Sequence, residues 1–144
     1  MRKSQGFTLL ELIIVLGIIS TMLLISATAY SQSQKRSRDA KRKADLNNIR
    51  SALEIYRSTN SFYPLTMDAL TTGTLYLKSV PSDPLEPRQS YKYVSKSGCN
   101  NTTVLCNDYT LYTKLENQPI NVCLVVQTCG SVSCNYCLGP YGEK

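Results

Sequence analysis

Six cysteines in the last third of the chain are the residues whose type and spacing most suggest chemistry. An even number of cysteines in a small domain is typical of disulfides formed in an oxidising compartment. Six cysteines allow about 15 pairings, and the sequence alone does not choose among them. A polar loop separates Cys99 from Cys106, which favours a local bridge between these two. The candidate disulfide residues are Cys99, Cys106, Cys123, Cys129, Cys134 and Cys137.

Two other chemistries are open to these cysteines. Cys134-Asn135-Tyr136-Cys137 has the spacing of a thiol-redox motif, but such a motif normally opens a helix in a strand-helix-strand unit. Here it lies in a Gly- and Ser-containing tail ahead of Gly139-Pro140. A zinc site needs four ligands, whereas the chain has a single C-x-x-C and no histidine. We expect structural disulfides and no resident metal, with metal binding and redox chemistry as the alternatives.

A lone carboxylate is the second unusual group. The 24 residues from Phe7 to Tyr30 contain one charge, Glu11. As a helix this run is about 36 Å long, enough to cross a hydrocarbon core of about 30 Å. An ionised carboxylate in hydrocarbon needs a cationic partner, and no Lys or Arg lies within a helical turn of Glu11. The partner must be another molecule or a terminal amine, which cleavage after Gly6 would create at Phe7.

The stretch Gly6-Phe7-Thr8-Leu9-Leu10-Glu11, followed by a long apolar helix, resembles the class III signal of type IV prepilins and pseudopilins. The resemblance implies that a prepilin peptidase cuts between Gly6 and Phe7 and methylates the new amine. It also implies that Glu11 helps to dock each subunit into a helical homopolymer, on an assembly platform of separate proteins. Many members of the family carry a proline near the position of Thr28, and this chain has none before Pro64.

An ordinary secretory signal or a plain membrane anchor is the simpler explanation of the same run. Arg2 and Lys3 would suit a secretory signal, but the run is longer than the 7 to 15 apolar residues that such signals contain. A glutamate inside a discarded peptide would also have no purpose. The prepilin-type signal is therefore favoured.

The sequence divides into four segments. Residues 1–6 form a leader, 7–30 a membrane or filament-core helix, 31–58 an amphipathic helix, and 59–144 a globular domain with a cysteine-rich C-terminus. The basic leader favours the cytoplasm, although a denser basic cluster after the run argues for the opposite orientation. Because disulfides belong outside, we expect a single pass of the inner membrane with the C-terminal domain outside, and later an extracellular or periplasmic filament. The basic cluster consists of Lys35, Arg36, Arg38, Lys41, Arg42 and Lys43.

Three partners are open to the basic cluster. Lipid headgroups or water are the first, and Asp39 and Asp45 of neighbouring subunits are the second. Nucleic acid is the least favoured, because no aromatic residue is interleaved between Tyr30 and Tyr56.

The rest of the chain predicts an α+β fold. A helical apolar stripe is expected to cover a small antiparallel sheet, while the charged residues between the stripe positions face water or meet charged neighbours. Asn60 to Pro64 ends the helix, Thr66 is expected to cap a short helix over 67–70, and Gly73 allows a turn. Strands are predicted at 89–95, 108–115 and 121–127. The stripe comprises Ala40, Ala44, Leu46, Ile49, Leu53 and Tyr56, and the wet positions are Lys41, Arg42, Lys43, Asp45, Arg50 and Glu54.

A second resemblance is carried by Lys43-Ala44-Asp45-Leu46, Phe62-Tyr63-Pro64 and Val80-Pro81-Ser82-Asp83-Pro84. With these motifs, the stretch from Gln5 to Leu115 resembles the major pseudopilins of type II secretion and small pilins built like them. Where those proteins often have a tryptophan-glycine pair after Asp-Pro, this chain has Leu85-Glu86, and its cysteine-rich tail is foreign to them. Some of them bind calcium in a sheet loop. Asn107 and Asp108 could contribute ligands, but two residues fall far short of the roughly six to eight oxygens that calcium takes.

These observations predict a structural filament subunit without cofactor or catalytic site, in a pilus-like fibre for motility, adhesion or DNA uptake. A secretion pseudopilus is the first alternative. An anchored redox enzyme and an anchored DNA receptor are more distant, because both leave Glu11 unexplained. The absence of histidine removes Ser-His-Asp and Cys-His sites outright.

Overall fold

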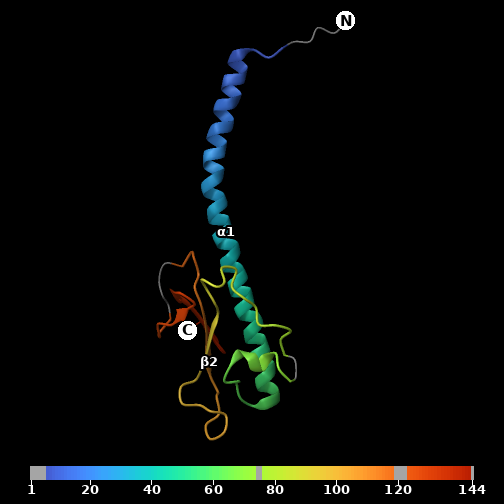
Figure 1. The fold of residues 1–144 in the computed structure, drawn as a ribbon, viewed down its shortest axis with the longest axis vertical. Coiled ribbons are helices and arrows are strands. Elements are labelled where there is room, and N and C mark those ends of the chain that lie inside the picture. The colour runs from blue at the N-terminus through green and yellow to red at the C-terminus, as the bar shows by residue number, and fades with distance from the viewer. Residues whose placement is uncertain (1–5, 74–75, 119–122, 144) are drawn as a thin grey trace. The chain divides into compact units, whose positions relative to one another are not determined.

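The structure is a computed structural model that describes residues 6–73, 76–118 and 123–143. It divides into a first compact unit that ends at Arg36 and a second that begins at Ser37. One helix, α1 (Leu9–Asn60), runs through the boundary and is 52 residues long (Figure 1). The long N-terminal helix that the sequence predicted is thus confirmed.

In the first unit, the helix has no covering layer. Every large apolar side chain from Phe7 to Ile25 is exposed, from 47 % at Ile19 to 85 % at Phe7. The helix is long and apolar enough to cross a membrane. Apolar surface of this extent requires lipid or another protein around it.

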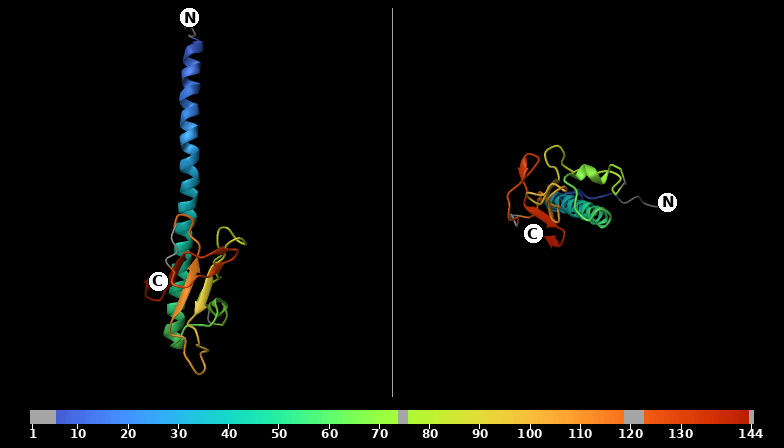
Figure 2. Two further views of the ribbon diagram at one scale, coloured as in Figure 1. Left: turned by 90° about the vertical axis from the view of Figure 1, so that its left-hand side faces the viewer. Right: turned by 90° about the horizontal axis from the view of Figure 1, so that it is seen from below.

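In the second unit, α1 lies beside a four-stranded antiparallel sheet (Figure 2). The strand order is β1 (Lys92–Ser95), β2 (Tyr109–Thr113), β5 (Tyr136–Gly139) and β6 (Gly142–Glu143). Tyr93 lies opposite Leu111, which lies opposite Leu138. A separate hairpin is formed by β3 (Thr128–Cys129) and β4 (Val132–Ser133).

The two faces of this sheet have different covers, as the two-residue period of a strand requires. On β5, Tyr136 and Leu138 belong to the core that includes Leu46, Ile49 and Leu53 of α1. Cys137 between them faces the other way and packs with Tyr112, Cys129 and Cys134. The helix therefore covers one face, and the cysteine-rich segment covers the other.

The predicted stripe on the helix is partly confirmed. Leu46, Ile49 and Leu53 are fully buried, and Tyr56 is half-buried. Ala40 and Ala44 are exposed, so their assignment to the core was wrong. Arg42 and Asp45, on the side expected to be wet or to meet charged neighbours, are both buried, so they do not face water. Their neighbours are charged, as the second alternative predicted. Arg42 lies one turn before Leu46 and shares its face. The buried carboxylates of Asp39, on the same helix, and of Asp83, on another segment, pair with it.

The predicted third strand was also wrong. Residues 123–127 form no strand, and residues 121 and 122 lie outside the described part of the chain. Leu124, Val125 and Val126 are 92 %, 55 % and 69 % exposed, and three consecutive apolar residues lack the alternation of a half-buried strand. The sheet instead takes its third strand from 136–139, within the segment interpreted as a tail.

The connection after the helix follows the prediction with one exception. Helix α1 ends at Asn60, a short 3₁₀ helix η1 spans Met67–Leu70, and Gly73 has a φ of 68° that suits a turn. Thr66 does precede η1, but its side chain makes no capping hydrogen bond. Thr66 is therefore the N-cap residue of η1, as predicted, but without a hydrogen bond from its side chain.

All six cysteines are in disulfides, and none is free. The expected local bridge joins Cys99 to Cys106, and the other two join Cys123 to Cys137 and Cys129 to Cys134. The disulfide-rich C-terminal region is thus confirmed.

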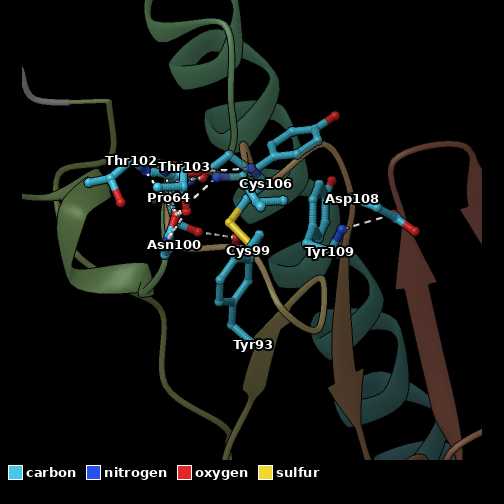
Figure 3. Close-up of a disulfide and its surroundings, with 12 residues drawn as sticks. Pro64, Tyr93, Cys99, Asn100, Thr102, Thr103, Cys106, Asp108 and Tyr109 are labelled. Atoms are coloured by element: carbon cyan, nitrogen blue, oxygen red, sulfur yellow. Dashed lines mark hydrogen bonds between the residues drawn. A yellow bond between two sulfur atoms is a disulfide. The ribbon is translucent and has the colours of Figure 1, made fainter.

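The Cys99–Cys106 loop is held against the turn that follows α1 (Figure 3). The Asn100 carboxamide oxygen accepts hydrogen bonds from the backbone N–H groups of residues 102, 103 and 104, at 2.9 to 3.1 Å. The Tyr93 hydroxyl donates to the carbonyl of Pro64, and the Tyr63 N–H donates to the carbonyl of Cys106. These bonds fix the end of the helix to the entrance of β2.

We predict that natively exported protein resists alkylation when no reductant is present. Reduction should lower the melting temperature of the second unit clearly, because one bridge typically contributes about 2–4 kcal/mol. Mass spectrometry after iodoacetamide treatment measures the labelling, and reduced, denatured protein, which should take six labels, is the control. Six labels without reduction, or stoichiometric bound zinc, would contradict structural disulfides.

Candidate assembly site

The predicted site residues Gly6, Phe7 and Glu11 lie at the start of α1. Gly6, Phe7 and Thr8 precede the helix, and Phe7 is 85 % exposed. The first main-chain bond of the helix runs from the Leu12 N–H to the Thr8 carbonyl at 3.3 Å. The Thr8 hydroxyl oxygen accepts the Glu11 N–H at 3.2 Å, which makes Thr8 the N-cap. Sequence reasoning missed this residue, although Thr8-x-x-Glu11 is the spacing of a capping box.

The carboxylate of Glu11 is left for another partner. Its backbone N–H, and not its side chain, makes the contact with Thr8. Within residues 6–73, 76–118 and 123–143, no Lys or Arg forms an ion pair with Glu11. The site therefore offers an anion on an exposed apolar helix.

The basic cluster is not one surface. Lys35 and Arg36 are exposed, while Arg38 and Arg42 pair with carboxylates. Lys41 lies 3.8 Å from a carboxylate oxygen of Asp45, and Lys43 lies over the Tyr136 ring. The prediction that all six residues contact lipid headgroups, water, neighbouring subunits or nucleic acid is therefore only partly right. Four of them interact with groups of the second unit itself: Arg38, Lys41, Arg42 and Lys43.

The fully buried guanidinium of Arg42 is the centre of a charge cluster. It donates to Asp83 through Nε at 2.8 Å and Nη2 at 3.1 Å, and through Nη1 at 2.9 Å to both Asp39 and Glu116. Arg38 donates two bonds of 2.7 Å to the Glu116 carboxylate. We call these residues the Arg42 cluster: Arg38, Asp39, Arg42, Asp83 and Glu116.

The electrostatics of the Arg42 cluster favour the charged forms. Hydrogen bonds from Arg38 and then Arg42 lower the pKa of Glu116 to about 2. Burial alone would raise the pKa of Asp39, but N–H groups of Glu116 and Asn117 donate to its carboxylate and bring the pKa below its ordinary value. Burial opposes the charge on Arg42, and the bonds to Asp83 and Glu116 overcome it, so that its pKa is raised. The cluster therefore ties the helix to the loop at 83 and to the chain beyond β2.

The C-x-x-C motif does not form a dithiol site. Cys134 is bonded to Cys129 and Cys137 to Cys123, so the two sulfurs belong to different bridges. Cys137 lies within a strand, and no helix follows the motif in the described sequence. The thiol-redox alternative was therefore wrong for this arrangement of the chain.

The candidate calcium residues lie at the entrance of β2. One carboxylate oxygen of Asp108 accepts the Tyr109 N–H at 2.8 Å, and Asn107 is exposed. Among the described residues, no group of three or more His, Cys, Asp or Glu side chains is placed to hold a metal ion.

Comparison with known proteins bears directly on the N-terminal segment. The family model described as the prokaryotic N-terminal methylation motif matches residues 1–27. The type II secretion system core protein G of Vibrio cholerae is 29 % identical over 109 residues, which cover 66 % of this chain and 73 % of that protein. The type IV wide pilus major component PilA4 of Thermus thermophilus is 35 % identical over 83 residues, which cover 58 % of this chain and 62 % of that protein.

The chain is a homologue of type IV pilins and major pseudopilins. A second secretion system core protein G, from Dickeya chrysanthemi, is 32 % identical over 60 % of this chain and 54 % of its own length. No solved structure matches the chain. In this pilin homologue, the matched methylation motif contains Gly6, Phe7 and Glu11 and ends before the Arg42 cluster.

For this pilin homologue we predict that Arg42→Met lowers the free energy of unfolding of the second unit by about 3–5 kcal/mol. Removal of one partner from a buried ion pair leaves the other charge unpaired, here the buried Asp83. Arg36→Met is the matched control, because Arg36 is exposed and forms no ion pair with any described residue. Denaturant unfolding in detergent, followed by tyrosine circular dichroism, measures both. If the free energies of unfolding of Arg42→Met and Arg36→Met differ by less than about 1 kcal/mol, the cluster is not needed for stability.

Proposed function

We propose that this chain is a structural subunit of a type IV pilus-like filament. A prepilin peptidase cuts it after Gly6 and methylates the amine of Phe7, and the subunit assembles through α1 into a helical homopolymer. The chain itself catalyses nothing, and separate motor and platform proteins supply the work of extension. The sequence similarity to PilA4 and to the secretion proteins supports this proposal.

The observation that carries the proposal is Glu11 on an exposed apolar helix, with no ion pair to any Lys or Arg among the described residues. A plain anchor would gain nothing from a carboxylate that costs several kcal/mol to place in hydrocarbon. A polymer subunit gains from it, because a neighbouring copy offers the amine of its Phe7 as the cation. The charge of each partner then offsets the desolvation of the other, but only in the assembled state.

Before assembly, we place the subunit in the inner membrane through residues 7–30, with lipid around the exposed side chains. The basic leader belongs in the cytoplasm, and the domain with three disulfides belongs outside. After assembly, the same helix surface contacts other subunits in an extracellular or periplasmic fibre. Lys35 and Arg36 remain exposed beyond the apolar run and suit anionic headgroups in the membrane-bound state.

A secretion pseudopilus is the second candidate, because the aligned region covers 73 % of the Vibrio cholerae protein. Deletion of the gene separates the two. If the deletion strain lacks surface filaments but secretes exoproteins normally, the chain is a pilus subunit. If exoproteins accumulate in the periplasm, it is a pseudopilus subunit.

We predict that the mature protein begins at Phe7 and bears a methylated amine. The matched methylation motif supports this cleavage site. Intact mass and N-terminal sequencing of protein purified from its native membrane decide the question. A mature start at Met1, or one beyond Ala27, would exclude processing of the prepilin type.

We also predict that Glu11→Ala and Glu11→Gln enter filaments poorly, with Ala at least as defective as Gln. Both remove the charge that the neighbouring amine requires, and Ala also removes the shape of the side chain. Each variant should still insert, be cleaved and form its disulfides. The amounts of sheared and membrane-retained protein measure assembly.

Glu86→Gln is the matched control, because it makes the same chemical change at an exposed carboxylate of the second unit. It should assemble like the unchanged protein. A normal filament yield from Glu11→Ala would show that Glu11 is not an essential docking group. It would favour the alternative of a simple membrane anchor.

A further inference from the structure

The start of α1 is set at one residue, Thr8. The Leu12 N–H donates to the Thr8 carbonyl, so the main-chain hydrogen bonds of the helix begin there. Gly6 and Phe7 lie upstream of this point and are not helical. Among the described residues other than its chain neighbours, no heavy atom lies within 4 Å of the place where a side chain on Gly6 would begin. The Gly6-Phe7 peptide bond is thus outside the helix and open on the Gly6 side.

The side chain of Thr8 acts at the same point. The first N–H groups of a helix have no partner within the helix, and the Thr8 hydroxyl oxygen satisfies that of Glu11 at 3.2 Å. This bond exists only when residue 8 is the N-cap and Glu11 is in the first turn. The hydroxyl therefore favours a helix that begins at Leu9 over one that begins earlier or later.

We propose that Thr8 is a positioning residue for prepilin processing, because its capping hydroxyl keeps the Gly6-Phe7 bond out of the helix. This inference rests on the proposed function. Hydrolysis adds water across that bond and leaves a carboxyl group on Gly6 and an amine on Phe7. A helical peptide unit holds its C=O and N–H in internal hydrogen bonds, whereas an extended one presents both to an enzyme.

The test compares two substitutions in the full-length precursor, reconstituted in lipid vesicles with a purified prepilin peptidase. Thr8→Val keeps the shape of the side chain and removes the hydroxyl, while Thr8→Ser keeps the hydroxyl and removes the methyl group. We expect Thr8→Ser to be cleaved at nearly the original rate. Thr8→Val should be cleaved about fivefold more slowly, which corresponds to the ~1 kcal/mol of a lost N-cap.

Amide hydrogen exchange of the uncleaved precursor in micelles separates positioning from direct contact with the enzyme. The Glu11 amide should exchange about fivefold faster in Thr8→Val and at an unchanged rate in Thr8→Ser. A hydroxyl that served only to contact the peptidase would leave this exchange rate unchanged in both variants, and that result would overturn the proposal.

Three cleavage results also overturn it. If Thr8→Val is cleaved as fast as the original chain, the cap has no role in processing, while the proposed function stands. If Thr8→Ser is slowed as much as Thr8→Val, the shape of threonine matters and its hydroxyl bond does not. If the unchanged precursor is not cut after Gly6 at all, the proposed function fails and this inference fails with it.

Discussion

The apolar surface of α1 has to be covered, and the rest of the structure depends on that constraint. In the second unit, Leu46, Ile49 and Leu53 are buried against the sheet. In the first unit, the large apolar side chains from Phe7 to Ile25 are exposed, and no described residue covers them. At roughly 25 cal/mol per Å², such a surface strongly favours a lipid or protein environment over water. One helix therefore serves both as the core of a folded domain and as a surface that only other molecules can cover.

Two kinds of interaction stabilise the packing of α1 in the small second unit. The Arg42 cluster joins residues 38–42 of the helix to Asp83 and Glu116, which come from two distant segments. The cysteine-rich segment covers the face of the sheet that α1 does not reach, and its two bridges anchor it at Cys137 and Cys134. Charge pairing and covalent links thus supplement a hydrophobic core that is limited by the size of the domain.

The long-range features of the fold could be predicted because they depend on strong periodic patterns. The long helix, the first two strands and the disulfide-rich end follow from apolar spacing and cysteine count. The burial of Arg42 could not be predicted, because it depends on carboxylates 41 and 74 residues away in the sequence. The third strand was misplaced because Leu124-Val125-Val126 is the more apolar run, whereas β5 is a short strand buried on both faces, with Cys137 bonded to Cys123. At the N-terminus, the roles of Gly6, Phe7 and Glu11 stay predictions from the motif, and the capping role of Thr8 was overlooked although its spacing was visible.

We propose that Glu11 is paired between subunits and not within one. A high-resolution cryo-electron microscopy map of sheared native filaments measures this directly. We expect the Phe7 amine nitrogen of each subunit to lie about 3 Å from a carboxylate oxygen of Glu11 in a neighbouring subunit. A map in which these atoms are separated by more than about 4 Å throughout the fibre, or in which Glu11 faces water, would contradict it.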